Sequence, residues 1–456
     1  MPKLNYCLIF VAHEYGQGLK HGMKVVIINK SDSTGGAAVV SRRLMEALRL
    51  KGVDASMLVV EKFSPSPWVS LAAGRLAIKR RFFLERLKIF IANGFNRSTL
   101  FQIDTGEVGL PLWRHPEVKA ADAILLSWVN QGMLSLRGIG KLKRLGKPII
   151  WTMHDMWPMT GICHHAATCR RFLDQCGDCP LLGRRGGPGD LSHKIWERKQ
   201  GLYKRGRMAF VAVSRWLRDR ARLSGLLKES RIEVIPNPFM PLPEPSVPGS
   251  HSSGKIRILF GAARLDDPVK GLDILKKALA LLTHRLDGEN KQEGNSNSIF
   301  PPIEVALFGN VKEAGSLAGF QHLMVVFGTL KGDEAVARAY READILVSAS
   351  SYETFGCTLQ EAQAYGVVPV SFNQGGQVDI IEDGVTGFLA EWVEDEDQRA
   401  RNLAEAMLKA IKLVADTESL KKMKEEMARS VAEKFSYSVV ADAYIDLIES
   451  VSNAPS

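Results

Sequence analysis

The sequence lacks any long apolar run, and this absence limits the kind of protein it encodes. No run approaches the roughly 18 to 20 apolar residues that a helix needs to cross a bilayer. Residues 1–22 resemble a signal peptide only faintly and lack a small-x-small cleavage site. An aromatic and basic recognition motif for nucleic acid is also absent, and the basic residues are dispersed. We therefore expect a cytoplasmic protein that does not bind nucleic acid.

The composition is that of a globular protein with more than one domain. The chain has 456 residues, more than a single core usually covers, with 45% apolar and 24% charged residues. Its 60 Lys and Arg against 50 Asp and Glu give a formal charge of +10, which favours anionic partners such as nucleotide phosphates, anionic lipid or nucleic acid without choosing among them.

Short apolar runs, each followed by a helical pattern, recur in two series. The first includes KVVIIN, AILLSW and PIIWTM, and the second begins with KIRILFGAARL. Unbroken Val, Ile and Leu runs between amphipathic helices are typical of buried parallel strands. The predicted fold class is α/β, with two tandem doubly wound Rossmann-like domains that face a central cleft.

Proline and polar residues mark the predicted boundaries. Because a proline-rich stretch cannot continue either sheet, residues 238–254 are interpreted as a linker between domains at residues 23–237 and 255–435. Residues 436–456 are expected to form a helix that packs back on the first domain. Residues 1–22 precede the first predicted strand and are interpreted as a non-native extension.

Four charged side chains follow predicted strands of the second domain. Arg264 and Lys270 lie in FGAARLDDPVKG, and Glu353 and Glu361 lie in SSYETFGCTLQEAQ. Carboxyl ends of parallel strands meet at one edge of a sheet, so the four should face one crevice. There the cations could neutralise a diphosphate and the carboxylates could bind sugar hydroxyls. The alternatives are a basic loop that caps a helix and ordinary surface glutamates.

The first domain offers a glycine pair and a histidine. Gly35 and Gly36 lie between a strand and a helix, where backbone N–H groups can approach a phosphate, although a simple turn explains the pair equally well. His154 follows the strand PIIWTM and is a candidate for contacting reacting sugar hydroxyls, against a structural role.

Four of the six cysteines, Cys163, Cys169, Cys176 and Cys179, lie close together in the sequence. The last two form Cys-Gly-Asp-Cys, a spacing that suits a tetrahedral thiolate site, so the four are candidate ligands of a structural zinc. His164 and His165 are candidate substitutes. Free thiols are the alternative, since a cytoplasmic chain should not keep disulfides.

Residues 68–95 combine Arg and Lys with Leu, Ile and Phe in an amphipathic pattern. Such a helix can lie on anionic lipid headgroups, which predicts contact with the inner face of the cytoplasmic membrane. It can equally pack as an ordinary surface helix.

The motifs GGAAVV, ARLDDPVKG, SSYETFGCTLQEAQAYGVVPV and GGQVDIIEDGVTGFL resemble those of the retaining glycosyltransferases of family 4, which have the GT-B architecture. The segments WTMHDMWPMTGICHH and CGDCPLL are similar to a bacterial subgroup that includes colanic acid transferases and builds surface polysaccharides. The resemblance implies a nucleotide-sugar donor, UDP- or GDP-linked, and a glycan or polyprenyl-diphosphate-linked acceptor.

The resemblance also implies a role for each candidate. Glu361 would hold the nucleotide ribose, Glu353 the donor sugar, Arg264 and Lys270 the diphosphate, Gly36 would close under it, and His154 would lie near the transferred sugar. Further donor-binding positions would be Gly35, Phe355, Gly356, Cys357 and Thr358, and Gly375 and Gly376 would shape the cleft. Ser127 stands where the subgroup usually has a histidine, which leaves acceptor binding by that position in doubt.

No well-placed carboxylate nucleophile is evident, so we expect front-face attack in which the leaving phosphate accepts the acceptor proton. No metal cofactor should be required for this catalysis. An epimerase or hydrolase of the same fold is the nearest alternative function, and a non-catalytic, zinc-stabilised scaffold is a more distant one.

Overall fold

A computed structural model describes residues 22–204, 206–242, 254–292, 301–320 and 323–453. They divide into two compact units, Met1–Pro238 with Tyr437–Ser456, and Phe239–Ser436. Most of the predicted linker and of the predicted N-terminal extension lies outside the described residues. No helix in the described ranges is long and apolar enough to cross a membrane.

The first unit is built on a parallel sheet of seven strands in the order β3-β2-β1-β4-β5-β6-β7. Its central strands are almost fully buried, as their Val, Ile and Leu runs predict. The strands are β1 (Lys24–Ile28), β2 (Asp54–Val59), β3 (Val69–Leu71), β4 (Ala123–Leu126), β5 (Ile149–Met153), β6 (Met208–Ala212) and β7 (Ile232–Val234).

Helices cover this sheet, and the last helix of the chain is among them. The helices are α2 (Gly36–Leu50), α3 (Arg75–Ala92), α4 (Pro116–Ala120), α5 (Leu136–Lys143), α6 (Leu191–Tyr203), α7 (Arg215–Leu223) and α13 (Tyr437–Ser452). Apolar side chains of α2 and α13 share one core with β1, β2, β4, β5 and β6. In that core Tyr444 shares a hydrogen bond of 2.8 Å with Thr152, and at its edge Lys51 pairs with Asp442 at 2.7 Å.

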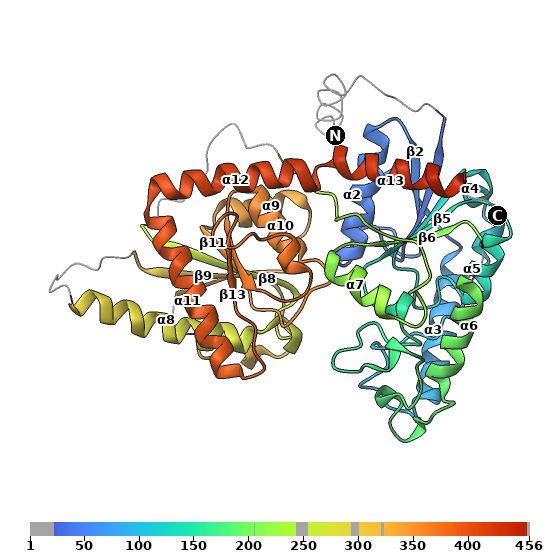
Figure 1. The fold of residues 1–456 in the computed structure, drawn as a ribbon, viewed down its shortest axis with the longest axis horizontal. Helices are drawn as coiled ribbons and strands as arrows, with labels where there is room; N and C mark the ends of the chain where they lie inside the picture. The colour runs from blue at the N-terminus through green and yellow to red at the C-terminus, as the bar shows by residue number, and fades with distance from the viewer. Residues whose placement is uncertain (1–21, 205, 243–253, 293–300, 321–322, 454–456) are drawn as a thin grey trace. The chain divides into compact units, whose positions relative to one another are not determined.

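The second unit repeats this plan with six parallel strands in the order β10-β9-β8-β11-β12-β13. The strands are β8 (Ile256–Arg264), β9 (Ile303–Asn310), β10 (Leu323–Gly328), β11 (Ile345–Ser348), β12 (Val368–Phe372) and β13 (Phe388–Ala390). The helices are α8 (Leu272–Gln292), α9 (Asp333–Arg341), α10 (Cys357–Ala364), α11 (Glu396–Ala415) and α12 (Thr417–Phe435). Helices α8 and α11 lie side by side against the sheet (Figure 1).

The strand orders decide where each unit can bind a ligand. The chain runs outward from β1 through β2 and β3, then returns to place β4 on the other side of β1. In the second unit β8 and β11 stand in the same relation. Crevices at such reversal points, beyond the carboxyl ends of the strands, are the usual ligand sites of doubly wound sheets.

Candidate functional site

The reversal point of the second unit brings two of the predicted charged residues into direct contact. Lys270 belongs to η5 (Pro268–Lys270), a short 3-10 helix in the loop after β8, and Glu353 lies in the loop after β11. The Lys270 ammonium contacts Glu353 Oε1 at 2.6 Å, and the Ser350 hydroxyl donates to the same oxygen at 2.8 Å. Both charged side chains are about a quarter exposed, which leaves the pair accessible from solvent.

The backbone holds these two loops together. The N–H of Ser351 donates to the carbonyl of Val269 at 2.9 Å. Gly271 ends the Lys270 turn in a left-handed conformation with φ of 74°, and a Cβ there would lie 2.1 Å from the Ala349 carbonyl oxygen. Only glycine fits this approach, because the position is both left-handed and too close for a side chain. The contact between Lys270 and Glu353 is therefore built on a fixed backbone.

Electrostatics keep Lys270 charged. Burial alone would lower the pKa of Lys270, but the carboxylate of Glu353, through its charge and its hydrogen bond, raises the pKa above the ordinary value. Lys270 therefore carries a positive charge at neutral pH, at the reversal point of the second sheet.

Arg264 is the last residue of β8 and contacts acids of its own loop. Its guanidinium lies 3.1 Å from Asp267 Oδ2 and 3.6 Å from Asp266 Oδ1. Asp266 in turn accepts hydrogen bonds from the backbone N–H groups of Lys312 and Glu313, which follow β9. The arginine thus has carboxylate neighbours that orient it at the same end of the sheet as Lys270.

Glu361 lies on α10, which begins after the loop of Glu353. The hydroxyl of Tyr340, a fully buried residue of α9, donates to Glu361 Oε2 at 2.9 Å. Gly356 caps the start of α10 with φ of 106°, and Phe355 beside it is buried. Cys357 and Thr358 lie in the first turn of this helix, and Glu361 lies one turn further on.

The Gly375 and Gly376 pair packs against the backbone of the Glu353 loop. The N–H of Gly376 donates to the Glu353 carbonyl at 2.7 Å, and a Cβ on Gly376 would lie 2.4 Å from the Thr354 carbonyl oxygen. This close approach fixes the shape of the loop that carries Glu353.

The remaining candidates belong to the first unit. Gly35 has φ of 90° and caps the N-terminus of α2, and a Cβ on Gly35 or Gly36 would meet no atom within 4 Å. His154 follows β5, and burial lowers its pKa to about 4 although the charge of Asp155 opposes the shift. It is therefore a neutral imidazole at physiological pH. The Ser127 hydroxyl shares a hydrogen bond of 2.7 Å with Ser41.

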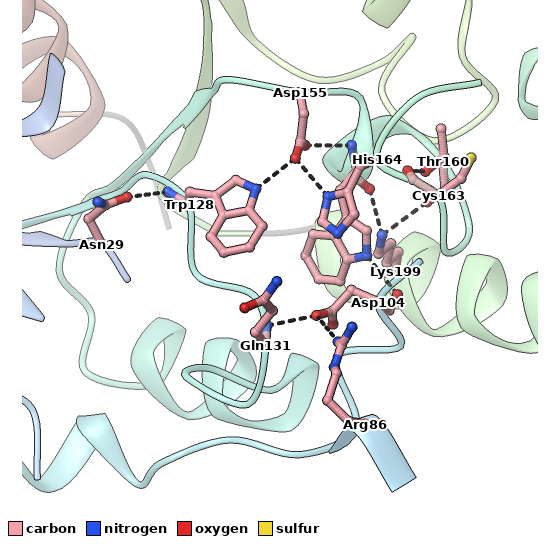
Figure 2. A network of polar contacts seen from close by, with 11 residues as sticks. Asn29, Arg86, Asp104, Trp128, Gln131, Asp155, Thr160, Cys163, His164 and Lys199 are labelled. Atoms are coloured by element: carbon pink, nitrogen blue, oxygen red, sulfur yellow. Dashed lines mark hydrogen bonds and ion pairs between the residues drawn. The ribbon is translucent and has the colours of Figure 1, made fainter. Parts of the chain in front are cut away.

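A polar network surrounds the loop after β5 (Figure 2). Asp155 Oδ2 accepts from Trp128 Nε1 at 2.8 Å and contacts His164 Nδ1 at 2.7 Å. Burial would raise the pKa of Asp155, but the charge and hydrogen bond of His164 contribute most to lowering it to about 2. This pair occupies only Nδ1 of His164, so the histidine stays a candidate substitute for a cysteine as a metal ligand.

A second part of the network contains a buried ion pair. Arg86 Nη2 lies 3.1 Å from Asp104 Oδ2, which also accepts from the backbone of Gln131 at 2.7 Å (Figure 2). Burial and the neighbouring Asp104 raise the pKa of Glu85 to about 10, so Glu85 is a neutral acid at pH 7. No pattern in the sequence pointed to this network or to Tyr340, because their partners lie on distant elements.

The chain matches two family models that together span most of its length. Residues 34–239 match the model described as Glycosyltransferase Family 4, and residues 249–429 match the model described as Glycosyl transferases group 1. The solved structure of a glycosyltransferase from Rickettsia africae covers 95% of this chain and 100% of its own, with a TM-score of 0.58 and 15% identity. That likeness concerns the fold alone.

Curated relatives match a shorter part of the chain. A glycogen synthase from Pseudomonas fluorescens is 35% identical over 112 residues, which are 25% of this chain and 21% of the relative. A GDP-mannose-dependent alpha-mannosyltransferase from Corynebacterium glutamicum is 32% identical over 117 residues, 23% of this chain and 28% of the relative. The chain thus spans less than a third of the length of these relatives.

The protein is of the GT-B class. It has two parallel sheets, two domains that match glycosyltransferase models, and the fold of a solved glycosyltransferase. Within that class, the match of residues 34–239 supports glycosyltransferase family 4.

Proposed function

We propose that this chain is a retaining glycosyltransferase that moves a sugar from a UDP- or GDP-linked donor to a glycan or polyprenyl-diphosphate-linked acceptor, in the synthesis of a surface polysaccharide. The observation that carries this proposal is the Lys270 and Glu353 pair, locked at the reversal point of the second sheet. The mannosyltransferase among the relatives depends on a nucleotide sugar, which supports the same donor class here.

In this reaction the charged groups act on the donor. Arg264 and Lys270 neutralise the diphosphate as it leaves, which stabilises the transition state without a proton transfer from the protein. Glu361, oriented by Tyr340, accepts hydrogen bonds from the ribose hydroxyls, and Glu353 does the same for the donor sugar. The acceptor hydroxyl attacks the anomeric carbon from the face that the diphosphate leaves, and the leaving phosphate takes the proton of that hydroxyl.

The first unit supplies neutral groups. His154 has no positive charge at pH 7, so it can exchange hydrogen bonds with a sugar hydroxyl without opposing the positive charge that develops at the anomeric carbon. The N–H groups at the start of α2, next to Gly35 and Gly36, suit a phosphate oxygen.

A panel of UDP- and GDP-sugars tests the proposal. We expect at least one to raise the melting temperature, and we expect mass spectrometry to show a new glycoside when simple glycan acceptors are added. Anomeric NMR signals of the product should show retained configuration. Free sugar with every acceptor would favour a hydrolase, and no shift and no turnover across the panel would contradict the donor assignment.

We further propose that α3 contacts an anionic membrane surface. Leu76, Phe83, Leu87 and Ile91 are 40 to 83% exposed and share one face of the helix, opposite the buried Glu85 and Ile89. Exposed basic side chains flank that stripe, namely Arg75, Lys79, Arg80, Arg81 and Lys88. Apolar residues between cations suit the boundary between headgroups and acyl chains.

Flotation with vesicles tests this contact. We expect the protein to float with vesicles that contain phosphatidylglycerol and to remain behind with phosphatidylcholine alone. The double variant Phe83→Ser/Leu87→Ser should lose flotation, whereas Leu223→Ser, at another exposed apolar position, should keep it. Equal flotation of both variants, or indifference to lipid charge, would contradict the proposal.

A further inference from the structure

The four clustered cysteines line one small cavity in the first unit. Cys163, Cys169, Cys176 and Cys179 line a space of about 20 Å³ formed by the segment after β5 and the start of α6, together with apolar neighbours such as Ile162 and Phe172. This volume holds about one water-sized sphere. The fifth cysteine that the structure describes, Cys357, lies in the second unit.

Backbone groups point at two of these sulfur atoms. The N–H of Gly161 donates to Cys176 Sγ at 3.2 Å, and backbone hydrogen bonds from Leu181 and Leu182 reach the sulfur of Cys179. Burial raises the pKa of Cys176 to about 11 and that of Cys179 above its ordinary value, and these hydrogen bonds, which favour the thiolate, oppose the shift. Outer groups that donate to the ligands are typical of metal sites.

The turn that carries Cys176 and Cys179 is fixed by its surroundings. Asp190 Oδ2 accepts from the N–H of Cys179 at 2.7 Å, while Asp190 also caps the start of α6. A Cβ on Gly177 would lie 2.6 Å from the Pro188 carbonyl oxygen, so glycine is needed between the two cysteines. The backbone of this turn is thus fixed before any ion binds.

A buried cation lies nearby. Lys199 is fully buried, and its ammonium donates to the carbonyl oxygens of Trp157 at 2.6 Å and Thr160 at 3.0 Å (Figure 2). Burial lowers the pKa of Lys199 to about 7, although the negative charges of Cys176 and Cys163 would oppose this shift. Four thiolates and one Zn²⁺ carry a charge of −2, which the Lys199 ammonium would partly offset.

We propose that Cys163, Cys169, Cys176 and Cys179 bind one structural zinc ion as thiolates and release their protons to solvent. Among the described residues, no three potential ligands yet stand in metal-binding geometry, so the cysteine side chains must rotate toward the cavity centre to reach the Zn–S distance of about 2.3 Å. The ion would tie the loop after β5 to the start of α6. Because Cys163 precedes His164, zinc would also position the Asp155 and His164 pair.

Metal content of the full chain tests this proposal. Protein expressed in zinc-supplemented medium and purified without chelator should contain about one zinc per chain by mass spectrometry of the elements. Cys176→Ser/Cys179→Ser should lose most of it, whereas Cys357→Ser should keep it. If the double variant does not fold, the natural chain still tests the proposal. An organomercurial that reacts with four thiols of that chain should release the zinc.

Cobalt gives an independent readout. Cobalt added to the chelator-treated chain should produce the absorption of a tetrahedral thiolate site, and zinc should displace it. Less than about a tenth of a zinc per chain together with four reactive thiols would overturn the proposal. A disulfide between any two of the four cysteines in the purified protein would overturn it as well.

Discussion

Replacing Lys270 by alanine tests the donor site most directly. The change removes the ammonium that lies 2.6 Å from Glu353 and that the proposed reaction uses against the leaving diphosphate. A hydrogen bond to a charged group contributes about 1.5 to 3 kcal/mol, and each 1.4 kcal/mol corresponds to a tenfold change in rate. Lys270→Ala should therefore lower kcat/KM by about ten- to a hundredfold.

The effect on stability should be smaller. The pair is partly exposed, so its loss should reduce the free energy of unfolding by about 1 kcal/mol and leave the fold intact. Lys277→Ala is a matched control, since Lys277 pairs with Asp397 at 2.8 Å at an exposed position on α8. It removes the same charge from the same unit.

The assay is release of UDP or GDP from the donor that the panel identifies, with urea unfolding of each variant in parallel. Lys277→Ala should keep the natural rate. The reasoning is refuted if Lys270→Ala turns over as fast as the control, or if both variants lose activity equally. A loss of activity that tracks unfolding would likewise contradict a direct role in binding the diphosphate.

Three further predictions follow from single residues. Glu361→Ala should lower turnover at least tenfold, which corresponds to about 1.4 kcal/mol of barrier. Tyr340→Phe removes only the hydrogen bond that orients Glu361, so it should weaken nucleotide binding less than Glu361→Ala does. Calorimetry with UDP and GDP can rank the nucleotide affinities of the two variants. Gly271→Ala should destabilise the chain by about 1 to 3 kcal/mol in urea unfolding, while Gly315→Ala, with open space around it, should not. Glu85 has a folded pKa of about 10 against an ordinary 4.5, so the stability it contributes is complete below pH 4.5 and is lost as pH rises through about 10. Over that pH range the free energy of unfolding should fall by up to about 1.4 kcal/mol per pH unit, and Glu85→Gln should reduce this slope. Equal slopes for the natural chain and Glu85→Gln would disprove the raised pKa of Glu85.

The sequence predicted the parallel sheets because each buried strand carries its own unbroken apolar run, as in β4 and β5. It also predicted that Lys270 and Glu353 would lie at one edge of the second sheet, since both follow strands whose carboxyl ends share that edge. Their direct contact came only with the structure. These inferences needed only the local pattern and the rule that parallel strands align.

Tertiary structure alone decided which groups fix those side chains. The bond from Tyr340 to Glu361 and the approach of Gly376 to the Glu353 loop join residues from different elements, and no local pattern records them. The charge states of Glu85 and His154 depend on burial, which is set by the packing of the whole unit. Residue type therefore determined which chemical groups are available. Packing determined where those groups lie and which protonation state they have.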